Sequence, residues 1–306
     1  MTRNKKFQKK LFDDDSVPKV DESNLSSHIF VPPIKCQGIK TKIVPVIKKN
    51  IRWDEQGKWI EPFLGSGVVL FNILPERAFA SDTNKHIIYF YQKIRSGAIT
   101  SENVRKHLEE NGKELLLRGE RYYYEVRERF NKTGDSLDFL FLNRSCFNGV
   151  MRFNSKGKFN VPFCRKTDRF RRPYITKIVN QTERLCRQII DKKDWAFECL
   201  DWKDALKKAK PNDFVYLDPP YIGRHTDYFG TWTQQDAEKL SEIAHKLPCP
   251  FILSMWSQNK YRTNEHLQNF WEDIKKVKIK HFYHVGPTES LRNEMEEVLV
   301  LGNQTT

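Results

Sequence analysis

The sequence predicts an α/β protein whose mostly parallel sheet is interrupted by an inserted, basic subdomain. Two observations lead to this fold class. Short apolar strand patterns alternate with helical patterns toward both ends of the chain, as in sheets whose parallel strands are joined by crossover helices. Between these regions, the sequence changes to charged helical periodicity and then to a segment rich in Asn, Gly and Arg.

The predicted elements follow from hydrophobic periodicity. Runs rich in Val, Ile, Phe and Tyr predict strands at 59–63, 78–81, 196–201, 214–218, 250–254, 280–285 and 296–301. Apolar residues at helical spacing predict helices at 84–94, 104–116, 120–130 and 234–247. In the middle of the chain, MRFN and KFNVPF flank the turn residues 155–157, a pattern typical of a β-hairpin.

These patterns predict three parts. Residues 1–28 are polar, with a basic block followed by three aspartates, and we expect them to form a flexible N-terminal arm. Residues 29–95 and 181–306 are expected to form the sheet domain. Residues 96–180 are expected to form the inserted subdomain, which combines helices with the hairpin.

Composition excludes several classes of protein. The 306 residues are 39% hydrophobic and 30% charged, which is typical of a soluble globular protein. No apolar run approaches the roughly 18 residues of a membrane helix, and the first residues lack the apolar stretch of a secretory signal. We therefore expect a cytoplasmic protein without membrane contact. We also expect the protein to be a monomer.

The distribution of charge and of cysteines limits which ligands the protein is expected to bind. The 53 Lys and Arg exceed the 39 Asp and Glu by 14 charges, and twelve of the cations lie between residues 144 and 187 against only two acids. Such a concentration is expected where a polyanion docks, although a solvated basic face is the alternative. The six cysteines are scattered, and no His, Asp or Glu cluster has ligand spacing, so no metal site is predicted.

The first chemical motif is FLGSG, which lies between a predicted strand and helix. Gly65 and Gly67 would let a ligand approach the backbone beside Phe63. A dinucleotide fingerprint needs a third small residue where Leu70 stands, which disfavours a dinucleotide-dependent oxidoreductase. Asp82 ends the second strand and could accept hydrogen bonds from both ribose hydroxyls of a nucleoside. The combination fits S-adenosylmethionine; a tight turn with a helix-capping aspartate is the alternative.

The second motif is Asp218-Pro219-Pro220-Tyr221, directly after the strand FVYL. Consecutive prolines make a stiff, extended turn without amide donors. The Asp218 carboxylate and the Pro219 carbonyl could each accept one hydrogen of an exocyclic amino group, while Tyr221 stacks on the heterocycle. A turn that only caps the strand would not need the flanking carboxylate and aromatic ring.

From about residue 30 to its C-terminus, the chain resembles the alpha-group, Dam-like DNA adenine methyltransferases. The matching segments occur in the family's order: IKCQGIK, EPFLGSG, SDTN, NRSCFNGVMRFNSKGKFNVPF, LDPPY and EEVLVLGN. The resemblance implies a Rossmann-like sheet that uses S-adenosyl-L-methionine, with a small inserted DNA-recognition subdomain. It also implies methyl transfer to N6 of a flipped adenine in double-stranded DNA.

The resemblance extends to individual positions. It assigns Cys36, Lys40, Asp82 and Asp218 to cofactor contacts and residues 218–221 to the catalytic loop. Phe147 falls where the family inserts an aromatic wedge into the DNA stack. The remaining DNA-contact positions are Lys35, Asn148, Val150, Arg152 and Pro162. Arg171 and Arg172 are added from the charge pattern alone, as expected phosphate contacts.

The sequence alone leaves other functions open. Methylation of cytosine at N4 would suit the same amino-accepting loop. A catalytically inactive DNA-binding relative would be expected to carry substitutions in the FLGSG or DPPY segments, both of which are intact. A modification enzyme of a restriction–modification system and a Dam-like enzyme without a restriction partner fit the motifs equally.

Overall fold

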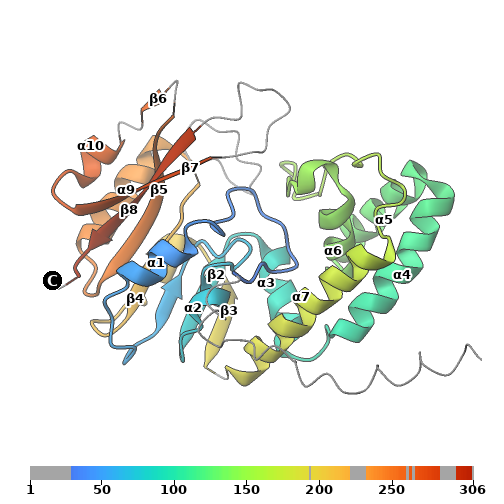
Figure 1. The fold of residues 1–306 in the computed structure, drawn as a ribbon, viewed down its shortest axis with the longest axis horizontal. Helices are drawn as coiled ribbons and strands as arrows, with labels where there is room; N and C mark the ends of the chain where they lie inside the picture. The colour runs from blue at the N-terminus through green and yellow to red at the C-terminus, as the bar shows by residue number, and fades with distance from the viewer. Residues whose placement is uncertain are drawn as a thin grey trace, which may run out of the picture.

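A computed structural model describes residues 29–192, 194–220, 232–259, 262–263, 266–282 and 294–304. One sheet has the strand order β3-β2-β1-β4-β5-β8-β7, with β6 paired to the end of β5 (Figure 1). The strands are β1 Trp59–Glu61, β2 Ala78–Asp82, β3 Trp195–Cys199, β4 Phe214–Leu217, β5 Phe251–Asn259, β6 Arg262–Thr263, β7 Lys275–Phe282 and β8 Glu294–Gly302. The pairs from β3 to β5 are parallel, whereas β8 runs antiparallel to both β5 and β7. The order therefore reverses between β1 and β4, where open α/β sheets bind their ligands.

Both faces of the sheet are covered by helices. The helices are α1 Val44–Asn50, α2 Leu70–Ile73, α3 Lys85–Arg95, α4 Ser101–Arg118, α5 Glu120–Thr133, α6 Ser136–Ser145, α7 Arg172–Asp191, α8 Trp202–Leu206, α9 Gln234–His245 and α10 His266–Trp271. Trp59 and Phe214 belong to one apolar core with α1, α2 and α3, whereas Ile60 and Val215 belong to a second core with α8, α9 and α10. This alternation is what strands buried on both faces require.

Helices α4, α5 and α6 lie together beside the sheet, and α7 runs along α4 back toward the sheet (Figure 1). Their ends are capped by the local sequence. Thr100 and Asn103 form a reciprocal capping box at α4, and Asp135 accepts hydrogen bonds from the first turn of α6. The apolar core on this side continues from the sheet into these helices without a break.

The predicted mixed α/β sheet is confirmed, with shifted ends. The strand predicted at 196–201 ends at Cys199, because Asp201 leaves the sheet to cap the N-terminus of α8. The strand predicted at 280–285 begins at Lys275, where it pairs with β8. The arm predicted at 1–28 lies outside the described residues, and the boundaries of the inserted subdomain stay a prediction. Among the described helices, none is long and apolar enough to cross a membrane.

Candidate active site

A cavity of about 290 Å³ opens at the carboxyl ends of β1, β2 and β4. Glu61, Asp82 and Tyr216 line it and lie at alternate positions that share the face of Trp59, Ala80 and the other residues of the first core. Because side chains alternate along a strand, this register gathers the polar side chains of neighbouring strands at one edge.

The Gly-rich turn forms one wall of the cavity. Gly65 and Gly67 have φ angles of 50° and 70°, which favour glycine, and a Cβ on Gly67 would lie 2.4 Å from the Phe71 ring. The turn is fixed by Asp82, whose Oδ2 accepts from the Gly65 amide at 2.8 Å and whose Oδ1 accepts from the Asn84 amide at 2.8 Å. Each carboxylate oxygen can accept a further hydrogen bond.

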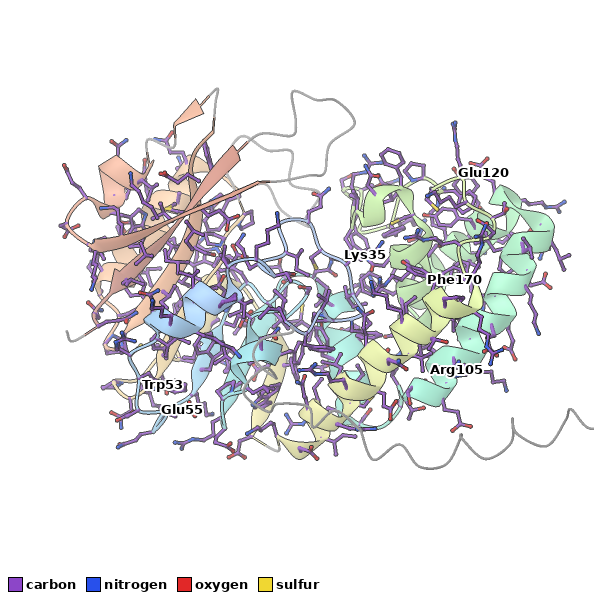
Figure 2. All side chains as sticks on the ribbon, in the orientation of Figure 1. Lys35, Trp53, Glu55, Arg105, Glu120 and Phe170 are labelled. Carbon is purple, nitrogen blue, oxygen red and sulfur yellow. The ribbon has the colours of Figure 1, made fainter. Side chains whose placement is uncertain are left out.

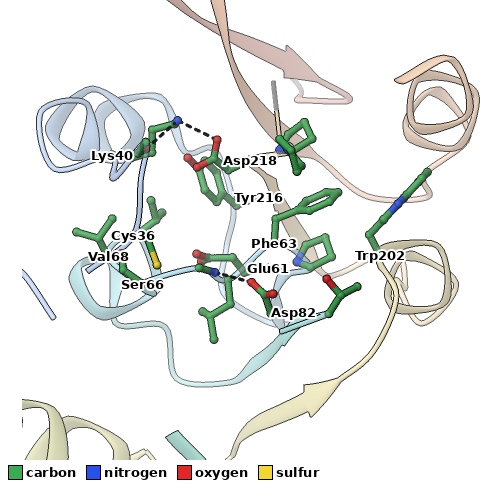
Figure 3. Close-up of a pocket in the computed structure, with 18 of the residues that line it drawn as sticks. Cys36, Lys40, Glu61, Phe63, Ser66, Val68, Asp82, Trp202, Tyr216 and Asp218 are labelled. Atoms are coloured by element: carbon green, nitrogen blue, oxygen red, sulfur yellow. Dashed lines mark hydrogen bonds and ion pairs between the residues drawn. The ribbon is translucent and has the colours of Figure 1, made fainter. Parts of the chain in front are cut away.

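Asp218 lies on the opposite side of the cavity, where Figure 3 shows its contact with Lys40. The Lys40 Nζ atom lies 3.0 Å from its Oδ1 atom. The Ser254 hydroxyl donates to the same Oδ1 atom at 3.0 Å, and the Tyr216 and Ser254 hydroxyl oxygens are 3.0 Å apart. The resemblance assigns Lys40 to a cofactor contact, which stays a prediction; in the structure Lys40 lines the cavity and forms an ion pair with Asp218.

The carboxyl groups of the cavity have raised pKa values. Withdrawal from bulk water raises the pKa of Asp218, and Lys40 opposes this shift. Burial raises the pKa of Asp82, against the effect of the two amides. Burial raises the pKa of Glu61 to about 8, although the Trp59 indole N–H donates to this carboxyl at 2.9 Å. Perturbed carboxyls in a cavity are typical of functional sites.

Aromatic side chains form the remaining wall. Phe63 stacks on Trp202 with ring centroids 6.1 Å apart, and Trp232 packs edge-on against Phe63 at 5.6 Å. On the other side, Cys36 Sγ lies 3.8 Å from the position that a Cβ on Gly65 would take. Such flat apolar walls suit a planar heterocycle.

Several residues of this site were not predicted from the sequence. Glu61 and Ser254 follow from strand alternation once the neighbouring strands are paired, so the signal was present but needed the register. Trp202 and Trp232 are 30 residues apart in sequence, and no local pattern indicates that they pack together in one wall of the cavity. Tyr221, the last residue of the predicted catalytic loop, lies outside the described residues; Pro219 and Pro220 line the cavity.

The predicted DNA-contact residues around the hairpin come together. The Phe147 amide donates to the Pro162 carbonyl at 2.9 Å, and antiparallel bridges join Cys146 to Phe163 and Phe153 to Phe159. These contacts confirm the predicted hairpin pairing. The Phe147 side chain is 54% exposed, so it is not buried under the hairpin as a core anchor would be.

The backbone next to Phe147 makes a tight turn. Asn148 has a φ angle of 53°, a conformation that asparagine adopts more readily than most residues. Val150 packs partly against the core, whereas the Arg152 side chain is exposed. Arg152 Nε donates to Asn160 Oδ1 at 2.9 Å, across the hairpin. Asn160 therefore orients the guanidinium while leaving part of it accessible.

Lys35 precedes Cys36, which lines the cavity, and contacts the residues around the hairpin. Its amide donates to Asn143 Oδ1 at 2.8 Å, and Asn143 Nδ2 donates back to its carbonyl at 2.9 Å. Figure 2 shows Lys35 between the sheet and the α4–α7 helices. A Cβ on Gly149 would lie 2.7 Å from Lys35 Cδ, so the side chain packs under the turn. Burial lowers the pKa of Lys35, and Arg144 and Arg169 add to this shift.

Arg171 and Arg172 lie at the start of α7. Arg171 pairs with Asp168, and neither arginine has a hydrogen bond or ion pair to the hairpin within the described residues. In the described part of the chain, no three His, Cys, Asp or Glu side chains are grouped so that they could hold a metal ion.

Comparisons with known proteins agree with this geometry. Residues 37–290 match the family of D12 class N6 adenine-specific DNA methyltransferases. A DNA adenine methylase of Vibrio cholerae is 28% identical over 281 residues, covering 88% of this chain and 94% of that protein. The Type II methyltransferase M.MjaIII of Methanocaldococcus jannaschii is 32% identical over 227 residues, covering 67% and 74%. A DNA adenine methylase of Salmonella typhimurium is 29% identical over 288 residues, covering 88% and 94%.

Proposed function

The chain belongs to the D12 class of N6 adenine-specific DNA methyltransferases, and from this premise we propose how its own residues carry out the reaction. S-adenosylmethionine is the methyl donor and binds between the Gly-rich turn and Asp218. Asp218 and the Pro219 carbonyl accept the amino hydrogens of an adenine that has left the duplex. The single observation that carries the proposal is the Asp218 carboxylate, held on one side and facing the cavity.

The cavity fits the proposed methyl donor. Asp82 keeps lone pairs for a ribose after accepting the two amides, and the glycines at 65 and 67 leave room beside the turn. Phe63, Trp202 and Trp232 offer apolar faces for the adenine ring. When bound, S-adenosylmethionine supplies an electrophilic methyl group.

The protein contributes position and charge. A base in a duplex cannot reach the cavity, so the target adenine must be extruded. The lone pair of its amino nitrogen is delocalised into the ring, and acceptors on both N–H groups favour a more tetrahedral, nucleophilic nitrogen. The Asp218 carboxylate then stabilises the positive charge that develops on this nitrogen during transfer.

Recognition is assigned to the hairpin and its supports. Phe147 is exposed and fixed by the Pro162 carbonyl, which suits a side chain that enters the base stack. Arg152 is oriented by Asn160 and reads a base edge, whereas Arg171 and Arg172 bind phosphates. Asn148, Val150, Pro162 and Lys35 complete the contact surface. We propose a monomer acting on double-stranded DNA.

The biological setting has two candidates. Relatives include proteins named DNA adenine methylase and one named Type II methyltransferase. These names support a Dam-like enzyme without a restriction partner and a modification enzyme of a restriction–modification system, respectively. Methylation profiles of DNA from cells that express the protein would reveal the target sequence, and restriction digestion of that DNA would test protection.

The reaction is tested with radiolabelled S-adenosylmethionine and duplex DNA in the absence of added metal, followed by nucleoside analysis. We expect label in N6-methyladenine. Label in N4-methylcytosine would show that the substrate base is cytosine and not adenine. Calorimetry with the product S-adenosylhomocysteine provides a separate readout, because binding without transfer would identify an inactive DNA-binding relative.

A further inference from the structure

The Ser254 hydroxyl contacts the active-site carboxylate, and the Tyr216 hydroxyl contacts Ser254, but neither has a role in the mechanism above. Both side chains are buried, Ser254 on β5 and Tyr216 on β4. Ser254 Oγ lies 3.0 Å from Asp218 Oδ1, 3.0 Å from the Tyr216 hydroxyl and 3.4 Å from the Leu217 carbonyl. These distances describe a hydrogen-bonded chain that ends on the carboxylate.

The direction of this chain follows from counting hydrogens. A serine hydroxyl has one hydrogen to donate, and an ionised carboxylate only accepts. If Ser254 donates to Asp218, the Tyr216 hydroxyl must be the donor in its contact with Ser254. Tyr216 thereby keeps the single Ser254 hydrogen directed at the carboxylate instead of at the tyrosine oxygen.

Both described contacts to the carboxylate end on the same oxygen. Lys40 Nζ approaches Asp218 Oδ1 from the loop before α1, and Ser254 approaches it from β5. Two donors from different elements restrict rotation of the carboxyl plane more strongly than a single lysine with a flexible side chain can. Within the described residues, Oδ2 is then the oxygen left for an incoming amino group.

We propose that Ser254, oriented by Tyr216, is a positioning residue for methyl transfer that fixes the Asp218 carboxylate with Oδ2 toward the target amine. This inference rests on the proposed function, because it requires Asp218 to accept a hydrogen of that amine. Small displacements of a group that must meet a reacting atom lower the rate strongly without loss of binding.

The surrounding charges make the inference testable by pH. Within the described residues, the ionisable groups that interact with Asp218 are Cys36 and Lys40 before α1, Glu61 on β1, Tyr216 on β4 and Glu297 on β8. Withdrawal from water raises the pKa of Asp218, Lys40 lowers it, Glu297 raises it, and the Ser254 hydrogen bond lowers it. Loss of the Ser254 hydroxyl should therefore raise this pKa further.

The test compares Ser254→Ala with Tyr216→Phe and with the control Ser241→Ala. Ser241 is a buried serine on α9 that donates to the Phe270 carbonyl at 3.2 Å, away from the cavity. We expect single-turnover transfer at neutral pH to fall about tenfold in Ser254→Ala and about two- to threefold in Tyr216→Phe. Affinities for DNA and for S-adenosylhomocysteine should change less than about twofold.

The acid limb of the rate profile separates positioning from loss of structure. In Ser254→Ala it should move to higher pH, whereas Ser241→Ala should keep the wild-type limb. Equal rates and equal limbs in the two alanine variants would overturn the proposal. If Ser254→Ala does not fold, Tyr216→Phe decides, because it removes the orienting donor and leaves Ser254 in place.

A measurement that does not require turnover distinguishes a failure of the Ser254 proposal from a failure of the proposed function. Absence of adenine methylation by the wild-type protein would overturn the proposed function alone. Carbon-13 NMR titration of labelled aspartate carboxyls, assigned with Asp218→Asn, reports on Asp218 directly. A higher midpoint in Ser254→Ala is the expected result, and an unchanged midpoint would contradict the role of Ser254.

Discussion

Asp138 in the helical part and Asp218 beside the cavity are held in opposite ways. The Asp138 side chain is 2% exposed. Arg129 donates to both of its carboxylate oxygens, from Nη2 to Oδ1 at 2.6 Å and from Nε to Oδ2 at 2.7 Å. His107 Nε2 lies 3.3 Å from the same carboxylate. Asp218 has a side chain that is 22% exposed, and Lys40 is its one ion-pair partner in the described residues.

The difference appears in the pKa values. Burial alone would raise the pKa of Asp138, but the two hydrogen bonds from Arg129, together with the nearby His107 imidazole, outweigh it and lower the pKa below its ordinary value. At Asp218 the balance is reversed, and the pKa is raised. A carboxylate paired on both oxygens stabilises the fold, whereas one paired on a single oxygen remains available to a ligand.

The largest expected effect concerns the available carboxylate. Asp218→Asn keeps the shape of the side chain but removes its charge, so single-turnover methyl transfer should fall roughly 10³-fold. Filter binding should show nearly unchanged DNA affinity. Asp138→Asn is the matched control and should retain near-normal transfer per folded molecule. Near-normal transfer by Asp218→Asn would remove Asp218 from the mechanism.

The second effect concerns the paired carboxylate. Arg129→Met leaves Asp138 without its bidentate partner and should lower the free energy of unfolding by about 2–4 kcal/mol at neutral pH. We place the value toward the lower end, because the Arg129 side chain is 47% exposed and solvent screens the pair. Urea unfolding measures this change. A loss below about 0.5 kcal/mol would show that the pair does not stabilise the helical part.

The pH dependence of that loss has a definite sign. Because the pKa of Asp138 is lowered in the folded protein, the stabilisation is present above the unfolded pKa of about 3.9. It disappears as pH falls through the lower folded value. The stability difference between wild type and Arg129→Met should therefore shrink below about pH 4, and a constant difference would contradict the ion pair as its cause.

A third prediction sharpens the contrast within the DNA-contact region. Phe147 is exposed and should hold the extruded state, offsetting an unstacking free energy of a few kcal/mol. With 2-aminopurine at the target position, Phe147→Ala should reduce the fluorescence rise on binding and leave thermal stability nearly unchanged. Phe141→Ala is the opposite control, because Phe141 is fully buried against Phe170 and its loss should lower stability. An undiminished rise in Phe147→Ala would exclude the wedge.

The smallest expected effect distinguishes recognition of a base by Arg152 from binding of the DNA phosphates. Arg152→Ala should relax the preference at one base pair by roughly 1–3 kcal/mol and change the salt dependence little. Asn160→Ala should show a weaker form of the same loss, because Asn160 orients the Arg152 guanidinium. Methylation rates on cognate and one-base-altered duplexes measure this preference.

Arg171→Gln together with Arg172→Gln should have the opposite signature. Binding to all sequences should weaken, and the slope of log affinity against log salt should flatten by about 0.9 per lost phosphate contact. If Arg152→Ala lowers methylation of cognate and altered sites by the same factor, Arg152 binds phosphate as well and the distinction fails.

Continuous apolar runs explain why much of the sheet could be predicted, because its parallel strands are buried on both faces. The sequence indicates β2, β4 and β8 because their residues are apolar or β-branched and bounded by turns. It does not indicate the order of strands, because pairing joins segments such as β1 and β4 that are more than 150 residues apart. Helix α6 was missed because it is buried nearly all round, so its apolar and polar residues show no clear helical period.

The site residues that belong to short contiguous motifs could be predicted from the sequence. Gly65, Gly67 and Asp218 stand within short motifs whose spacing suffices to predict a cofactor turn and an amino-accepting loop. Ser254 and Glu61 could not be assigned, because their roles depend on the neighbours that β-sheet register gives them. The pairing of Lys40 with Asp218 likewise needed the three-dimensional structure.

The free energies of unfolding of wild type, Asp138→Asn and Asp218→Asn at pH 8 test most directly whether Asp218 is held for chemistry and not for stability. We expect Asp138→Asn to lose about 2 kcal/mol, because Arg129 is left without its carboxylate. Asp218→Asn should stay within about 1 kcal/mol of wild type, because the amide oxygen can still accept from Lys40 and Ser254 while the cost of charge near the cavity floor is removed. A loss in Asp218→Asn as large as that in Asp138→Asn would contradict the distinction between the two carboxylates.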